Sequence, residues 1–178
     1  MSIWKRLGQI FRRGTKHEEF VSIVMPLNEP RDLPEHVLRA AAERAWKCKF
    51  EGTDENPDFV MHKSDHSVVC AGGHFLTVVN LARPYGDNPI GQAEEMKDVG
   101  QREAWLRHRG FTSIDYVQAI PFPISLQDKY TVIAKLAVEF VSANYIGICL
   151  PGEKQIIPAR ADLAHQLRNF STLEKLYG

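Results

Sequence analysis

A long apolar segment between Ser125 and Val141 constrains the fold of this chain more than any other stretch. Ser125 precedes the segment and Asp128 follows three residues later. This is the spacing of a capping box, in which side-chain oxygens accept hydrogen bonds from the free amides of a helix N-terminus. Apolar residues then recur at helical spacing over most of the helix surface, and Asp128, Lys135 and Glu139 form a thin polar seam. A helix with so little polar surface must be covered by other elements.

Period-two alternation and β-branched runs bounded by turn residues predict about six strands, and two of them flank the apolar helix. An earlier helix starts at the cap pair Asp32 and Glu35 and ends near Lys47, between the first two strands. Tight turns separate the three short strands in the middle of the chain, which predicts an antiparallel meander. The predicted strands cover residues 20–27, 59–62, 66–71, 74–82, 111–120 and 145–150.

Strand, helix and strand therefore follow one another twice, which predicts a two-layer α+β domain with two β-α-β units. We expect helices packed on a mostly antiparallel or mixed sheet of about six strands, in a ferredoxin-like arrangement. Residues 155–157 are a candidate edge strand. A charged helix over 92–109 contains Gly100, which marks a kink or a break. Residues 15–178 are expected to form this single domain.

Residues 1–14 stand apart from the domain as a predicted amphipathic helix. Basic residues share this segment with an apolar face, which is typical of a helix on an anionic membrane surface or in a partner's groove. The simpler interpretation is a terminal helix docked on its own domain or on a second copy. We favour it because so short a helix binds lipid weakly by itself. The apolar face consists of Ile3, Trp4, Leu7, Ile10 and Phe11.

The charge balance and the cysteines limit the function. The 22 basic and 22 acidic residues leave a formal net charge of zero, and their distribution does not predict nucleic-acid binding. Cys48, Cys70 and Cys149 show no paired spacing, so we expect a reducing, cytoplasmic setting rather than a disulfide framework. We expect no transmembrane segment, because no apolar run reaches the roughly 20 residues of a membrane span, and no signal peptide.

Three histidines and a cysteine at four-residue spacing form the most conspicuous chemical cluster: His62, His66, Cys70 and His74. On a helix this spacing would place all four on one face as metal ligands, but the surrounding sequence predicts strands and turns. The set is a candidate metal site or, with Cys70 as nucleophile and His66 or His74 as base, a candidate hydrolase site. The alternative is a set of strand and turn histidines with ordinary hydrogen bonds and an inert, buried Cys70.

A second group of candidates lies between residues 83 and 108. The loop over 83–89 carries a cation, an aromatic ring and an acid, and loops of this kind carry binding residues more often than core elements do. A W-x-x-H pair follows near a helix end. Asp115, in the next strand, is expected on a solvated face. The candidate binding residues are Arg83, Tyr85, Asp87, Trp105 and His108.

From Ala104 onward, the pattern A-W-x-x-H, an alternating strand, a long apolar helix and I-G-I-C-L-P resembles an uncharacterised bacterial family of unknown function. The first strand and its turn at Asn28, Glu29 and Pro30 are similar to the start of such proteins, so the resemblance spans most of residues 19–170. It implies a compact bacterial α+β domain and brings no catalytic residues with it. The basic N-terminal helix is an addition of this sequence.

The sequence contains no G-x-G-x-x-G, no G-x-S-x-G and no Walker-type loop. We therefore expect a cytoplasmic, non-catalytic binding or protein-interaction module with no identified cofactor. A homodimer or a protein partner is expected to be contacted through the N-terminal helix. The competing hypothesis is a hydrolase that uses the His62, His66, Cys70 and His74 cluster, with or without a metal. Peripheral membrane contact is a third and weaker hypothesis.

Overall fold

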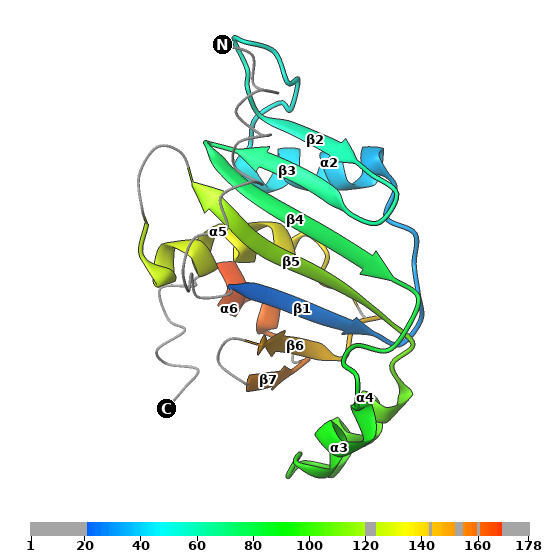
Figure 1. Ribbon diagram of the computed structural model, residues 1–178. Helices are drawn as coiled ribbons and strands as arrows, with labels where there is room; N and C mark the ends of the chain where they lie inside the picture. The colour runs from blue at the N-terminus through cyan, green and yellow to red at the C-terminus, as the bar shows by residue number, and fades with distance from the viewer. Residues whose placement is uncertain (1–20, 120–123, 143, 152–154, 160, 169–178) are drawn as a thin grey trace.

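The computed structural model describes residues 21–119, 124–142, 144–151, 155–159 and 161–168 (Figure 1). Within these ranges the chain forms seven strands and five helices. The strands are β1 (Ser22–Leu27), β2 (Phe59–His62), β3 (Ser67–Ala71), β4 (His74–Leu81), β5 (Gly110–Ala119), β6 (Gly147–Leu150) and β7 (Gln155–Pro158). The helices are α2 (Glu35–Trp46), α3 (Pro89–Glu94), α4 (Val99–Arg107), α5 (Leu126–Val138) and α6 (Leu163–Arg168).

All seven strands belong to one sheet in the order β2-β3-β4-β5-β1-β6-β7, and every neighbouring pair is antiparallel. The predicted α+β class is therefore confirmed. The sheet is larger than the about six strands predicted, because β7 pairs with β6 along its whole length and adds a seventh. The predicted ferredoxin-like arrangement stays a prediction.

β1 lies in the interior of the sheet, between β5 and β6. Every residue of β1 is buried, as expected for a strand covered on both faces. Its side chains alternate between the faces, so Ile23 and Met25 join one core while Val24 joins another. The sheet therefore has apolar surface on both sides.

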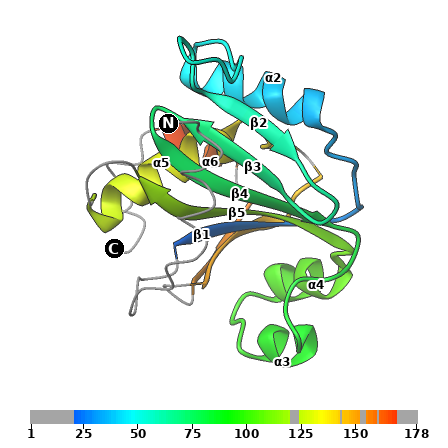
Figure 2. The same ribbon diagram turned by 45° about the horizontal axis from the view of Figure 1, so that its top comes forward.

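The larger core lies between the sheet and α2, α5 and α6, which pack on the same face (Figures 1 and 2). α5 fills the centre of this layer, and most of its side chains are buried, as its thin polar seam predicts. The Ser125 hydroxyl accepts a hydrogen bond from the Asp128 amide at 3.1 Å, so the predicted cap is confirmed. Burial of its apolar side chains supplies most of the stability of α5, because isolated helices of this length are marginal in water.

The opposite face of the sheet carries α3 and α4 at one end, away from α2 (Figure 2). Here Ala93, Met96 and Trp105 pack against Val24, Phe111 and Cys149. Ala93 lies in α3, Trp105 in α4 and Met96 in the segment between the two helices. The two short helices therefore cover the second face of the sheet at this end.

Two sequence expectations are corrected. The helix predicted over 92–109 is broken into α3 and α4, and the break lies before Gly100, where the Asp98 carboxylate accepts from the Gln101 amide and starts α4. The Asp32 cap of α2 is wrong: Pro34 occupies the N-cap position with no side-chain hydrogen bond to the helix. The Glu35 carboxylate, expected to complete that cap, instead binds Arg39 at 2.6 Å.

The connections β1–α2–β2 and β5–α5–β6 both join parallel strands that are not neighbours, since an odd number of antiparallel strands separates them. The two predicted β-α-β units are therefore present, with α2 and α5 on one face. Across the described ranges, none of the helices has the length and apolar character needed to cross a membrane.

Candidate functional site

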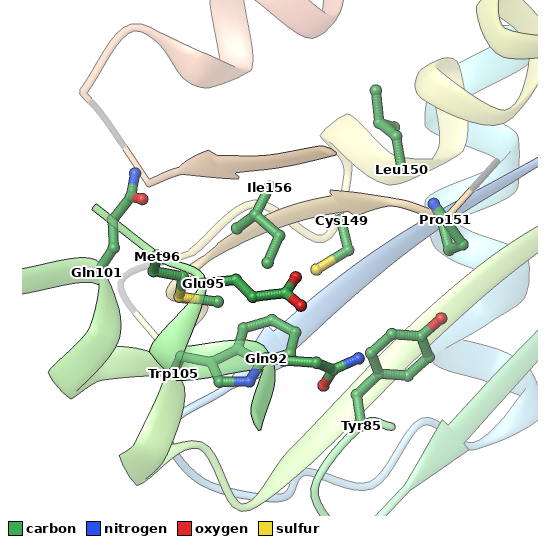
Figure 3. A pocket seen from close by; sticks show the side chains of 10 residues that line it. All are labelled: Tyr85, Gln92, Glu95, Met96, Gln101, Trp105, Cys149, Leu150, Pro151 and Ile156. Carbon is green, nitrogen blue, oxygen red and sulfur yellow. The ribbon is translucent and has the colours of Figure 1, made fainter. Parts of the chain in front are cut away.

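A pocket of about 490 Å³ lies between the α3–α4 pair and the strands β6 and β7 (Figure 3). Its size falls within the range of small-molecule sites, roughly 300–1,000 Å³. Tyr85 and Trp105 supply aromatic walls, and the apolar part comes from Met96, Cys149, Leu150, Pro151 and Ile156. The polar lining residues are Gln92, Glu95 and Gln101.

Local capping builds the helical side of the pocket. The Asn88 side chain accepts from the Gly91 amide at 3.0 Å and starts α3, with Pro89 in its first turn. Asp98 does the same for α4 at 2.7 Å. Because each helix is short and separately capped, Met96 and Trp105 can both turn toward the sheet, where each is at least nine-tenths buried.

The W-x-x-H pair ties α4 to the preceding loop. The His108 ring lies beside the Trp105 ring, with 4.8 Å between centroids. His108 Nε2 accepts a hydrogen bond from the Tyr85 backbone amide at 2.8 Å, and its Nδ1 contacts the Trp105 carbonyl. A backbone N–H can only donate, so the geometry makes Nε2 the acceptor and places the ring proton on Nδ1, which donates to the carbonyl. His108 therefore helps to position Tyr85.

Tyr85 stands against two rings. It meets Trp105 at right angles, with centroids 6.4 Å apart and an interplanar angle of 89°, and Phe111 at 5.1 Å and 70°. Edge-to-face contacts of this kind hold a ring in one orientation. Burial raises the pKa of the Tyr85 hydroxyl, and its electrostatic interactions with Cys149 and Asp115 act in the same direction. Tyr85 is thus a fixed, neutral wall.

Two buried polar atoms of the pocket residues have no hydrogen-bond partner: Trp105 Nε1 and Gln92 Oε1. Figure 3 shows the indole nitrogen turned toward Gln92 and Tyr85. The Gln92 amide packs closely on Gly86, whose φ of +87° is a conformation that side chains with a Cβ rarely adopt. Leaving a buried donor or acceptor unpaired costs about 1–3 kcal/mol, so these two atoms are unusual in a folded protein.

The lining thiol is unsuited to nucleophilic chemistry. Burial raises the pKa of Cys149 to about 12, so it is a neutral thiol at physiological pH. All three cysteines of the chain are free thiols. Cys48, the only one of them that is exposed, lies beside Asp58, and burial together with that carboxylate raises its pKa as well.

Asp115 is half-buried and not solvated as predicted, although it does lie on the face opposite Ile114. Its carboxylate accepts hydrogen bonds from the Ser22 hydroxyl at 2.5 Å and the Ser113 hydroxyl at 3.4 Å. Burial raises the pKa of Asp115, and the hydroxyl donors oppose that change. The pairing of β1 with β5 places Ser22 directly opposite Asp115, and nothing in the local sequence indicates that pairing.

The structure brings together three of the five candidate binding residues, namely Tyr85, Trp105 and His108. Arg83 and Asp87 are exposed and line a neighbouring hollow of about 370 Å³ on the other side of Tyr85. They do not line the pocket. The predicted docking residues Ile3, Trp4, Leu7, Ile10 and Phe11 lie outside the described residues.

The histidine and cysteine cluster is spread over the meander. His62 and His66 line one hollow of about 430 Å³ beside the β2–β3 turn. His62 Nδ1 lies 2.9 Å from the Ser67 hydroxyl, and His66 Nδ1 lies 2.7 Å from the Asp65 carboxylate. These are local hydrogen bonds of the kind that the alternative interpretation requires.

Cys70 and His74 lie elsewhere. Cys70 packs with Phe59 and Phe75 on the opposite face of the sheet, where burial raises its pKa to about 12. His74 is at the far end of β4, and its Nδ1 lies 3.0 Å from the Tyr116 hydroxyl. Within the part of the chain that the structure describes, no group of three or more His, Cys, Asp or Glu side chains is placed to hold a metal ion.

Sequence reasoning missed Gln92, Glu95 and Ile156 as pocket residues. They belong to two short elements that are distant in the chain, and neither carries a motif. The available signal was the set of three spaced apolar residues in the broken polar helix. Such residues must pack on another element.

Comparison with known proteins does not extend this description. No protein-family model, curated protein or solved structure matches the chain. The resemblance to an uncharacterised bacterial family therefore stays a prediction, and function is inferred from the geometry of the site.

Proposed function

We propose that this protein is a non-catalytic binding module that takes a small-molecule ligand in the pocket between α3, α4 and the edge of the sheet. We further propose a ferredoxin-like frame, in which β3, β4 and β7 are additions to the two β-α-β units. The three free thiols support the predicted reducing, cytoplasmic setting.

The observation that carries this proposal is the unpaired indole N–H of Trp105. The side chain is only 2% exposed, so water does not reach it freely, and a buried donor without an acceptor is costly. The ring borders a pocket large enough for a small molecule. After a small movement of the neighbouring side chains, a ligand with an oxygen acceptor would satisfy this N–H and gain affinity from it.

The chemistry of the lining supports binding over catalysis. Catalytic groups are normally tuned so that their pKa lies near the operating pH. Here the shifts go the other way: the pKa values of Cys149 and Tyr85 both rise further above neutrality. The positions of the described candidates do not favour the hydrolase hypothesis, since the sheet separates Cys70 from His62 and His66. His74 pairs with Ala71, on the face opposite Cys70, and its ring nitrogen lies beside the Tyr116 hydroxyl.

The test is ligand titration followed by NMR of the tryptophan indole N–H signals. The chain has three tryptophans, and Trp105→Phe and Trp46→Phe assign their signals. Phenol, benzoate and tetramethylammonium serve as neutral, anionic and cationic probes. We expect at least one probe to move the Trp105 signal saturably while the Trp46 signal, on α2, stays in place.

Trp46→Phe is also the matched control for affinity, because it removes a half-buried indole from the other face of the sheet. Trp105→Phe should weaken binding of the active probe, and Trp46→Phe should not. If no probe moves the Trp105 signal, or if the two variants change binding equally, the pocket is not a ligand site.

A further inference from the structure

The charge of the pocket is one-sided. Glu95 is the only acidic or basic residue among the described lining residues. Figure 3 shows its carboxylate turned toward the space between Cys149 and Tyr85. We propose that the ligand is an organic cation, an alkyl- or quaternary ammonium compound held by the Tyr85 and Trp105 rings that line the pocket and by the Glu95 carboxylate. This inference rests on the proposed function and specifies the ligand class of the same site.

Two aromatic side chains of the lining can meet such a cation. Tyr85 and Trp105 both line the pocket, and they contact each other edge to face at 89° with centroids 6.4 Å apart. A cation within about 6 Å of a ring centroid is attracted by the negative face of the ring, and Trp is the strongest of the aromatic residues in this respect. His108 and Phe111 hold Tyr85 in place, so this aromatic wall is fixed before a ligand arrives.

The surrounding charges support a positive ligand. Asp115 interacts electrostatically with the Tyr85 hydroxyl, although it does not line the pocket. On α4, the basic side chain of Arg102 donates to the Met96 carbonyl at 2.7 Å and does not line the pocket. Arg83 is exposed in the neighbouring hollow, on the far side of Tyr85.

The remaining walls suit the methyl groups of an alkylammonium ion. Met96, Cys149 and Ile156 are apolar, and the two sulfur atoms are polarisable. A carbonyl, carboxyl or hydroxyl oxygen on the same ligand would accept from Trp105 Nε1, the buried donor that lacks a partner. The expected ligand is therefore a small ammonium compound with an oxygen a few bonds from the nitrogen.

The test compares two probes of the same shape. Choline carries a quaternary ammonium and a hydroxyl, and 3,3-dimethylbutan-1-ol replaces the charged nitrogen by carbon. Isothermal titration of the full chain should show choline binding about tenfold more tightly than its neutral counterpart, the difference expected of a partly desolvated cation on two rings. Equal affinity for the two probes would overturn the inference.

Substitutions separate the contributions. Glu95→Gln should weaken choline binding about twofold to fivefold, as for one exposed ion pair, and should leave the neutral alcohol unaffected. The control is Glu94→Gln, an exposed neighbouring acid that does not line the pocket and should change neither affinity. Tyr85→Leu keeps an apolar wall and should reduce the preference for choline. Equal effects of the two glutamate variants would contradict the assignment of Glu95.

The failure of this inference is distinguishable from the failure of the proposed function. If phenol moves the Trp105 signal and neither choline nor tetramethylammonium does, the pocket is a ligand site for another chemical class. If none of the probes reaches Trp105, both proposals are wrong.

Discussion

His108→Ala tests whether the W-x-x-H pair holds the pocket together. The change removes the acceptor of the Tyr85 amide hydrogen bond and the ring that lies 4.8 Å from Trp105. The Trp105 carbonyl keeps another donor, the His108 backbone amide at 3.3 Å. The loss therefore falls mainly on one backbone N–H and on the packing of a buried ring, since His108 is only 3% exposed.

The magnitude follows from these two losses. A buried donor left unpaired costs about 1–3 kcal/mol, and we take the lower half because the Tyr85 amide is only partly buried. The lost packing and the small cavity add about 1–2 kcal/mol. We expect His108→Ala to lower the free energy of unfolding by about 2–4 kcal/mol, measured by urea denaturation with tryptophan fluorescence.

Two variants control this measurement. His108→Gln places an amide oxygen near the position of Nε2, so it should recover part of the loss by accepting from the Tyr85 amide. His66→Ala removes a histidine whose ring partner, Asp65, is fully exposed, and we expect no measurable change. If His108→Ala and His66→Ala destabilise the protein equally, His108 does not position Tyr85.

Three further predictions concern the loop, the sheet and the N-terminus. Gly86→Ala and Gly72→Ala should destabilise the protein by similar amounts, about 1–2 kcal/mol each, because both glycines have positive φ and the atom 2.6 Å from a Cβ at Gly86 is Gln92 Oε1, the end of a flexible side chain that can move away. Urea denaturation of both variants checks this, and a much larger loss for Gly86→Ala would show that Gln92 cannot move. The raised pKa of Asp115 means that its contribution to stability is fully present below about pH 3.8 and is lost as pH rises through the folded-state pKa. Asp115→Asn should therefore gain stability relative to the natural chain as pH rises across that window; a difference that is constant with pH in thermal melts would refute this. If residues 1–14 dock on a second copy, their deletion should convert a dimer into a monomer in light scattering, and an unchanged molar mass would exclude that role.

Several features of the fold were predictable because they depend on neighbouring residues. The cap at Ser125 is local, and so is the turn at Gly72 and Gly73, two glycines with positive φ. Spacing and residue type therefore suffice to find them. The buried nature of β1 was readable from its uninterrupted apolar run. The W-x-x-H pair and Tyr85 were both recognised as candidates, but the hydrogen bond that joins His108 to the Tyr85 amide was not.

The sequence by itself determined the α+β class, the meander and the wrapped helix α5, because hydrogen bonds and side-chain periodicity within a short segment carry that information. Only the tertiary structure decided that β1 lies between β5 and β6, that Asp115 is half-buried beside Ser22, and that Glu95 meets Cys149 across one pocket. These outcomes depend on which distant strands pair and in which register. A one-residue shift would turn every side chain of a strand to the other face, and no local pattern specifies that choice.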